Sequence, residues 1–249
     1  MIEINAPQLR ESHEARMMTF PEQFERFAQI HLPANLSDAA ILRFQALGRA
    51  AAVSREEALA LNLHADHLVF VCSGATKLVA HASDRRDQVV GFHFPDELVV
   101  VPARAEHSYT LEAVRPSELL VFDYRDFTEL ARSDPAVLRS LLECARGSLS
   151  RSREKSLALG RKTATERLAG FLVAMAVRIG SIRDGTLSID LPMSRRDIAD
   201  SLGLTIETVS RQFSVLRELG LLETTGKAGV RIPDLRALEA RAGYLTEAA

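Results

Sequence analysis

Three side chains in the C-terminal part of the chain combine a chemistry and a spacing suited to reading DNA bases. Glu207, Ser210 and Arg211 lie three and four residues apart, so a helix would project them from one face. Arginine offers a planar fork of donors that matches two acceptors of guanine, glutamate accepts from the amino group of cytosine, and serine suits several bases. We therefore predict that these residues contact base pairs. The alternative interpretation is an ordinary solvated helix face.

The neighbouring residues predict two helices that would hold this face. The first begins after Ser194, a good N-cap with Asp197 at the third helical position, and ends at Gly203. Thr205 then caps a second helix. Two helices joined by a short turn with glycine form a helix-turn-helix, whose second helix enters the DNA major groove. The apolar residues that we expect to be buried are Ile198, Leu202, Val209, Phe213 and Leu216.

The residues after the second helix predict a basic β-hairpin. Residues 221–225 and 230–232 favour short strands, residues 226–229 favour a turn, and Pro233 ends the second strand. A helix-turn-helix followed by such a hairpin is typical of a winged DNA-binding domain. We predict that DNA phosphates are contacted by basic and hydroxyl side chains of this region, namely Arg195, Arg196, Thr205, Thr208, Lys227 and Arg231.

These residues also resemble a known family. The segments MSRRDIADSLG and LTIETVSRQFSVLRELGLL are similar to the C-terminal domain of the CRP/FNR transcription regulators. The E-x-x-S-R pattern of Glu207, Ser210 and Arg211 resembles the FNR and FixK-like branch, whereas Ile206 stands where the CRP branch typically has arginine. The resemblance implies a transcription regulator, expected to be an activator with a repressor as the alternative, that binds as a homodimer to an inverted repeat with TTGAT-like half-sites. It also implies RNA polymerase as a partner.

The N-terminal half has the pattern of a β-roll. From Ala50 onward, short apolar runs recur about every 8–12 residues, with expected turns at Gly74 and residues 84–87. The runs are HLVFVCSG, TKLVAHA, QVVGFHF, ELVVV, YTLEAV and ELLVFDY. Two helices are expected before them, over residues 20–30 and 36–47. We expect the second helix to be capped at Ser37 and buried through Ile41, Leu42 and Phe44.

The β segment resembles the sensor domain of the same family, with informative departures from its nucleotide-binding form. That form opens its phosphate cradle with glycine-glutamate-leucine and closes it with arginine-serine. The matching residues here are Asp96-Glu97-Leu98 and His107-Ser108. Without the arginine a phosphate loses its bidentate partner, and Asp96 would repel it. We therefore expect no bound cyclic nucleotide.

Cysteine and histidine usage argues against a metal cofactor. Cys72 and Cys144 are the only cysteines, fewer than the about four thiolates of a cubane iron–sulfur cluster. FNR itself has an N-terminal cysteine cluster, which FixK-like relatives lack. Both cysteines are interpreted as small apolar core residues, with a redox sensor as the alternative. A haem or metal sensor is a further alternative, because several histidines fall in the β region without metal-binding spacing: His64, His67, His81, His93 and His107.

A long helix is predicted from Asp134, an N-cap followed by Pro135, to Gly160. Its residues at heptad spacing predict the interface of a parallel dimer, although packing on the chain's own β-roll is an alternative for another face. Two serines interrupt this seam, which suggests a weak and adjustable dimer. The predicted interface comprises Leu138, Leu142, Ala145, Leu149, Ser152 and Ser156.

Together the predicted elements give an α+β fold. It comprises an N-terminal helical lead (1–49), a β-roll like a cyclic-nucleotide-binding jelly roll (50–133), a dimerisation helix (134–160) and a C-terminal winged helix-turn-helix domain (161–249). The last domain is expected to begin with a helix opened by a Thr163–Glu166 capping box and closed at Gly180. The buried residues of that helix would be Leu168, Phe171, Leu172 and Met175.

Composition places the chain among ordinary folded proteins. It has 249 residues, 47% of them hydrophobic and 26% charged, and a net charge of −2. Residues 161–249 carry 13 lysines and arginines against 11 acidic residues, so phosphate binding must depend on local placement. No N-terminal stretch pairs positive charge with an apolar run, and no apolar run approaches ~18 residues, so we expect a cytoplasmic protein.

Enzyme motifs are lacking as well. The sequence has no P-loop, dinucleotide fingerprint, nucleophile elbow or zinc-protease motif, so we expect no enzymatic activity. Two alternatives to a ligand-independent DNA-binding regulator stay open. One is a regulator of the same fold that responds to a cyclic nucleotide, haem or redox state. The other is a ligand-binding adaptor that no longer reads DNA.

Overall fold

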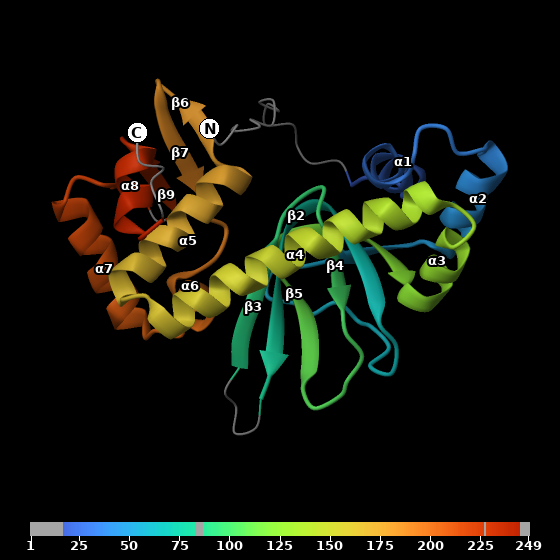
Figure 1. Ribbon diagram of the computed structural model, residues 1–249, viewed down its shortest axis with the longest axis horizontal. Coiled ribbons are helices and arrows are strands. Elements are labelled where there is room, and N and C mark those ends of the chain that lie inside the picture. Colours follow the sequence, from blue (N-terminus) through green and yellow to red (C-terminus); the bar gives the residue numbers. More distant parts are fainter. Residues whose placement is uncertain (1–16, 83–86, 227, 245–249) are drawn as a thin grey trace. The chain divides into compact units, whose positions relative to one another are not determined.

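The computed structural model describes residues 17–82, 87–226 and 228–244 (Figure 1). Contacts group these residues into two compact units, residues 17–151 and residues 152–244. The division falls inside one helix, α4 (Pro135–Arg161), so the last part of α4 packs with the C-terminal unit. The architecture is α+β, as predicted, with a β-rich N-terminal part, a long helix and a C-terminal helix-turn-helix.

The N-terminal unit is built on an antiparallel sheet whose longest strands are central. The described strands have the order β1-β5-β2-β3, and β4 pairs with β2 beyond this path. β2 pairs with three strands, so that His67 lies opposite both Val101 of β4 and Asp123 of β5. The strands are β1 (Arg49–Val53), β2 (His67–His81), β3 (Asp87–His93), β4 (Leu98–Val101) and β5 (Ser108–Asp123).

The predicted turn at Gly74 is wrong, because Gly74 lies inside β2. The runs HLVFVCSG and TKLVAHA form one strand, and register shifts against β5 between Val71 and Thr76 mark a bulge. Gly74 has φ +85°, a left-handed conformation that lets a strand kink and continue. The last two apolar runs likewise merge into β5. The other predicted turn falls mostly on residues 83–86, outside the described residues.

Successive residues of the strands point to opposite faces of the sheet and belong to two separate hydrophobic cores. One core contains Val69, Val71 and Val121 of the central strands. It is completed by Val99 and Val101 of β4 and by Val53 at the end of β1. Leu68, Phe70 and Phe122 face the other, which is covered by three helices: α1 (Phe20–His31), α2 (Asp38–Leu47) and α3 (Tyr124–Ala131).

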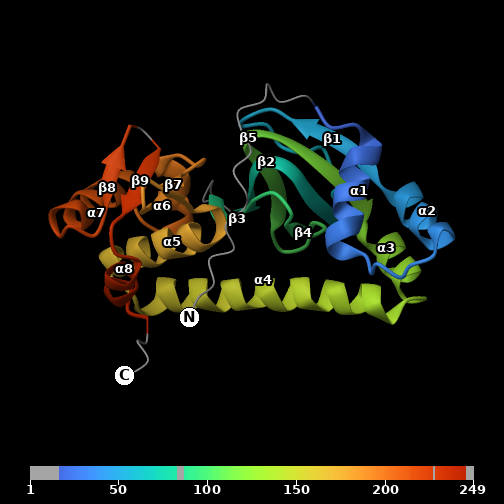
Figure 2. The same cartoon turned by 90° about the horizontal axis from the view of Figure 1, so that it is seen from above.

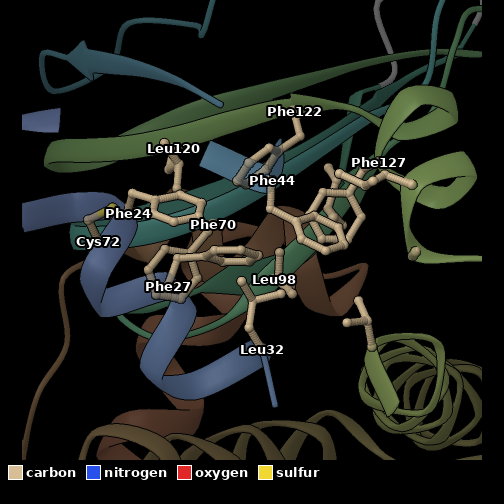
Figure 3. Close-up of a cluster of buried hydrophobic side chains, with 14 residues drawn as sticks. Phe24, Phe27, Leu32, Phe44, Phe70, Cys72, Leu98, Leu120, Phe122 and Phe127 are labelled. Atoms are coloured by element: carbon tan, nitrogen blue, oxygen red, sulfur yellow. The ribbon is translucent and has the colours of Figure 1, made fainter. Parts of the chain in front are cut away.

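The second core is an aromatic cluster centred on Phe27 (Figure 3). The Phe27 ring is fully buried, and its centroid lies 4.9 Å from that of Phe122, 5.5 Å from Phe70 and 5.9 Å from Phe127. Tilted and edge-on pairs of this kind add to the hydrophobic gain of burial. The rings therefore fix α1 and α3 on the sheet.

Helix α2 contributes Phe44 to this cluster, with its centroid 5.1 Å from that of Phe127. Ser37 caps the helix as predicted, since its Oγ accepts from the Ala40 amide at 3.3 Å. The expected burial of Leu42 is wrong: its side chain is 62% exposed. Leu42 precedes Phe44 by two residues, which places it about 200° around the helix, away from the core.

Within the N-terminal unit, helix α4 has a buried face and an exposed face. It begins as predicted, with Asp134 Oδ1 accepting from the Ala136 amide at 2.8 Å and Pro135 in the first turn. Val137, Leu141 and Cys144 pack against the aromatic cluster. The helix ends at Arg161 rather than Gly160. The predicted seam residues of this unit are all exposed: Leu138, Leu142, Ala145 and Leu149.

The described part of the C-terminal unit combines four complete helices and the last part of α4 with a small sheet (Figure 2). The complete helices are α5 (Ala164–Ile179), α6 (Arg195–Leu202), α7 (Ile206–Glu218) and the short α8 (Leu235–Arg241). Residues 152–161 of α4 also belong to this unit. The described strands have the order β6-β7-β9-β8. They are β6 (Ser181–Arg183), β7 (Thr186–Asp190), β8 (Glu223–Thr225) and β9 (Gly229–Ile232).

The sequence signals for this unit are confirmed. The Thr163–Glu166 capping box opens α5, and Gly180 follows its last residue. The strands β8 and β9 form the predicted hairpin. β6 was not predicted, because three partly exposed residues carry no periodic signal. The residues expected to be buried in α5 are all at most 9% exposed: Leu168, Phe171, Leu172 and Met175.

Among the described helices, none is long and apolar enough to cross a membrane.

Replacing Gly74 by alanine should destabilise the N-terminal unit. A Cβ at this position would lie within 2.2 Å of the Pro116 carbonyl oxygen, and the left-handed φ is strained for alanine. Such strain costs about 1–3 kcal/mol, and overpacking costs a similar amount. We expect a lower urea midpoint for this variant.

The matched control is Gly147→Ala, in α4 of the same unit. Its Cβ would meet only the flexible end of Arg151, at 3.5 Å. Alanine is the better helix former by about 0.8–1.0 kcal/mol, so this variant should be at least as stable as the natural protein. Equal midpoints for the two variants would contradict the assigned bulge.

Candidate nucleic-acid interface

Local hydrogen bonds build the helix-turn-helix of α6 and α7. Ser194 Oγ accepts from the Asp197 amide at 3.1 Å, and Asp197 Oδ2 accepts from the Ser194 amide at 2.9 Å. Gly203 has φ +62° and ends α6 in the left-handed conformation. Thr205 Oγ1 then accepts from the Thr208 amide at 3.1 Å and caps α7. These capping contacts and the glycine turn are those that the sequence predicted.

Helix α7 has one buried face and one exposed face. Val209, Phe213 and Leu216 are at most 5% exposed and pack into the C-terminal unit. Glu207, Ser210 and Arg211 are all exposed, and their spacing places them together on the other side. The structure thus brings the three predicted base-contacting residues onto one accessible surface.

The Glu207 carboxylate is held in its charged form. Its own backbone amide, the Thr205 hydroxyl and the positive charge of Arg211, in that order, lower the pKa of Glu207. An ionised carboxylate only accepts hydrogen bonds, whereas the Arg211 guanidinium only donates them. The exposed surface of α7 therefore presents an acceptor and a planar donor one helical turn apart.

Most of the predicted phosphate-binding residues lie at the surface of this unit. Arg196 is exposed in the first turn of α6, and Thr205 and Thr208 lie at the N-terminus of α7. Arg231 on β9 is partly exposed, with Nη2 3.3 Å from Asp184 Oδ2. Lys227 lies outside the described residues.

Arg195 differs from the other predicted phosphate-binding residues. Its guanidinium lies over the Phe213 ring, with Cζ 3.3 Å from the ring centroid. The side chain is half-buried, and burial lowers the pKa of Arg195. The structure therefore separates Arg195 from its exposed neighbour Arg196.

Arg167 near the start of α5 donates to carbonyls at the C-terminal ends of α4 and α6, a role that the sequence did not reveal. Its Nε donates to the Lys162 carbonyl at 3.0 Å, Nη1 to the Leu202 carbonyl at 3.1 Å and Nη2 to the Leu159 carbonyl at 2.8 Å. The last carbonyls of a helix lack partners within the helix, and a cation there is favourable. One side chain thus ties the ends of α4 and α6 to α5. Only its basic character was visible in the sequence.

Lys155 provides a second link between α4 and α6. Its Nζ donates to Ser201 Oγ at 3.2 Å, and burial lowers the pKa of Lys155 to about 8. The sequence placed this residue in a polar run, SLSRSREKS, with nothing to indicate burial. Together with Arg167, it makes the last turns of α4 a part of the helix-turn-helix unit.

The residues that match a nucleotide-phosphate cradle include a carboxylate that is already paired within the chain. Asp96 adopts φ +75°, and its carboxylate forms a bidentate pair with Arg26, at 2.5 and 2.9 Å. His107 is exposed, where the nucleotide-binding form has arginine. The Arg26 guanidinium is thus paired with the Asp96 carboxylate, and the two matching positions carry an acidic side chain and an exposed histidine.

Both cysteines pack with the aromatic cluster. Cys72 is fully buried, and burial raises the pKa of its thiol to about 12. Cys144 is partly buried, its pKa is also raised by burial, and its Sγ lies 3.8 Å from His31 Nδ1. Raised thiol pKa values disfavour the reactive thiolate.

The histidines of the β-roll have separate surroundings. His67 Nδ1 lies 2.9 Å from the Ala65 carbonyl, and the His81 ring lies between Asp87 and Thr110. His93 Nδ1 lies 3.8 Å from Glu97 Oε2. His64 and His107 are exposed.

Comparisons with known proteins agree with this description. Residues 166–241 match the Crp-like helix-turn-helix domain, and residues 60–134 match the cyclic nucleotide-binding domain. The chain is 36% identical to the transcriptional activator protein FnrL of Cereibacter sphaeroides over 182 residues, which are 72% of this chain and 73% of FnrL. It is 41% identical to the nitrogen fixation regulation protein FixK of Rhizobium meliloti over 152 residues, 61% and 67% of the two chains.

Solved structures show the same fold. FixK2 from Bradyrhizobium japonicum superposes with a TM-score of 0.71 and 30% sequence identity. The match covers 80% of this chain and 99% of the FixK2 chain.

The partly buried Lys155 makes stability depend on pH. Below pH 8 the folded and unfolded chains both carry the proton, and the cost of burying the charge is fully present. Between pH 8 and 10.5 the folded protein releases the proton more readily than the unfolded chain, whose Lys155 keeps its ordinary pKa of 10.5. The natural protein should therefore gain stability relative to a Lys155→Met variant as the pH rises through this range.

Urea unfolding of both proteins at several pH values measures this difference. The control is Arg153→Met, which removes an exposed charge from the same part of α4 without removing a group that titrates in this range. A difference between the natural protein and Lys155→Met that stays constant from pH 7 to 10.5 would refute the assigned burial.

Proposed function

Because this chain belongs to the CRP/FNR family of transcription regulators, we propose that it is an activator that binds, as a homodimer, an inverted repeat with TTGAT-like half-sites. The observation that carries the proposal is the exposed set Glu207, Ser210 and Arg211 on α7. The activator role is proposed from the name of the similar FnrL protein.

Each base-contacting residue has a proposed role. Arg211 donates two hydrogen bonds to guanine, and Glu207 accepts from the amino group of the cytosine paired with it. Ser210 contacts the adjoining base pair. The exposed Glu207 carboxylate suits this role, because in its ionised form it accepts hydrogen bonds on both oxygens.

Phosphate contacts would orient α7 in the groove. The proposed contacts are made by Arg196 on α6, by the hydroxyls of Thr205 and Thr208, and by the basic residues Lys227 and Arg231 of the hairpin. Arg196 has the exposure that such a contact needs. Arg231 would exchange its contact with Asp184 for a phosphate oxygen.

The proposed dimer forms along α4. Leu138, Leu142 and Leu149 are 38%, 66% and 50% exposed, at the spacing of a two-stranded seam. A second copy would bury these leucines, and Ser152 and Ser156 would extend the seam with polar residues. Two-fold symmetry would place the two α7 helices about one DNA turn, or ~34 Å, apart.

We further propose that DNA binding does not require a cyclic nucleotide, an iron–sulfur cluster or haem. The Asp96–Arg26 pair supports the first part of this proposal, because it brings a carboxylate to the cradle. The signal would then be the abundance of the protein or the strength of its dimer.

Selection of bound duplexes from random DNA tests the function as a whole. The expected result is an inverted repeat with TTGAT-like half-sites, selected by purified protein without added nucleotide. Failure to enrich any motif would favour the alternative of an adaptor that has lost DNA recognition. Enrichment only with cyclic AMP or GMP would overturn the proposed independence from nucleotide.

Arg211→Ala should weaken sequence discrimination. Loss of a bidentate contact to guanine costs about 1–3 kcal/mol at one base pair and leaves the protein tolerant of substitutions there. The measurement is the dissociation constant for duplexes that differ at each position of one half-site.

The matched control is Arg217→Ala, which removes the same charge from an exposed position six residues further along α7. It should leave the preference at every position unchanged. Equal losses on the selected and scrambled duplexes for Arg211→Ala would contradict the assigned role.

Replacing both Ser152 and Ser156 by leucine should tighten the proposed dimer. Both serines are exposed, and leucine at seam positions adds apolar surface for burial between copies. Sedimentation equilibrium should show a lower dissociation constant for the dimer.

Leu142→Glu is the opposing variant, which should weaken the dimer by placing charges at the seam. Unchanged sedimentation for all variants would show that the interface lies elsewhere.

A further inference from the structure

We propose that Arg195 is a positioning residue for α7 and not a phosphate ligand: its contact with Phe213 sets the angle at which α7 presents Arg211. The inference rests on the proposed function, because it concerns how the base-contacting residues are oriented. It reverses the role that the sequence predicted for Arg195.

The contact between Arg195 and Phe213 is close and sheltered. The guanidinium carbon lies 3.3 Å from the centre of the ring, and Phe213 is only 5% exposed. Arg195 Nη1 is buried and has no hydrogen-bond partner among the described residues. Arginine is weakly hydrated and planar, so it can stack on an aromatic face where lysine would keep its water. A phosphate contact needs donors at the surface, and Nη1 is not available for one.

Helix geometry connects this contact to the base-contacting face. Phe213 follows Arg211 by two residues and so lies about 200° around α7, nearly opposite to it. Any roll of α7 that moves the Phe213 ring therefore swings Arg211 in the opposite direction. The Arg195 side chain comes from the first turn of α6, which the Ser194–Asp197 capping box holds in place.

A second contact holds Gln212, the residue between Arg211 and Phe213 in α7. The Thr165 hydroxyl of α5 donates to Gln212 Oε1 at 2.5 Å. Gln212 and Phe213 are thus held by two different helices, immediately after Arg211. Contacts from two directions resist rotation of α7 better than either alone.

This orientation matters most for base reading. A bidentate contact requires the plane of the guanidinium to align with the guanine edge, whereas phosphate contacts tolerate small shifts. Loss of the Arg195–Phe213 contact should therefore reduce discrimination between sequences while leaving the number of phosphate contacts unchanged.

The experiment compares full-length Arg195→Ala and Arg195→Lys with Arg196→Ala. Each is titrated with a duplex of two inverted TTGAT half-sites and with a scrambled duplex of equal composition, over a series of salt concentrations. The ratio of the two dissociation constants measures discrimination, and the slope of log affinity against log salt counts phosphate contacts.

Arg195→Ala should lower the discrimination ratio by ~10-fold and leave the salt slope unchanged. Arg196→Ala should lower the slope by about one and keep the ratio. Arg195→Lys separates the two roles, because lysine retains the charge but not the planar stack. It should lose discrimination as Arg195→Ala does, whereas a phosphate ligand would be largely rescued.

Phe213→Leu tests the same contact from the side of the ring. Thermal unfolding verifies that every variant is folded at the assay temperature. Phe213→Leu should lower discrimination as Arg195→Ala does, and the double variant should be no worse than the single ones. Arg195→Ala that lowers the slope by about one, with equal losses on both duplexes, overturns the inference. So does Arg195→Ala that changes neither quantity.

A natural protein that does not discriminate between the two duplexes gives a different outcome. It would refute the proposed half-sites themselves, so the two failures can be told apart.

Discussion

The rotational setting of α7 about its own axis is the constraint on which the rest of this structure depends. Burial fixes that setting: Val209, Phe213 and Leu216 are almost completely enclosed. Burying each such side chain contributes about 1.5–3 kcal/mol, whereas an exposed ion pair contributes about 0–1 kcal/mol. The apolar face therefore decides which side of α7 is exposed, with Glu207, Ser210 and Arg211 on that side, and the proposed Arg195–Phe213 contact refines the angle. The polar residues could not impose that orientation themselves.

The last turns of α4 belong physically to the helix-turn-helix unit. Arg167 binds carbonyls at the ends of α4 and α6, and Lys155 reaches Ser201 in α6. Gly203 also lies next to the end of α4, because a Cβ at this position would be 3.3 Å from Leu159 Cδ2. The two serines of the proposed seam, Ser152 and Ser156, stand on the same helical segment as Lys155. A change in pairing along that segment would act directly on the residues that hold α6.

A fold does not by itself determine what it binds, and the β-roll is a scaffold held together by its own side chains. Its stability comes from two cores, one of them the aromatic cluster around Phe27, and neither core needs a phosphate. At the cradle, Asp96 and Arg26 satisfy each other. The match of residues 60–134 to the cyclic nucleotide-binding domain therefore describes the scaffold of this unit.

The sequence by itself determined the beginnings of helices and the two faces of α7. Ser194, Thr205 and Asp134 act as caps because their partners are within three residues, and the stripe of α7 follows from spacing alone. Tertiary structure decided what depends on distant partners. Gly74 stays inside a strand where the next amide, that of Ala75, donates to the distant Ser117 Oγ. Lys155 is partly buried with its Nζ on Ser201 of α6, and Arg195 lies over the Phe213 ring. Local rules cannot anticipate these outcomes, because the atoms that decide them come together only when the chain folds.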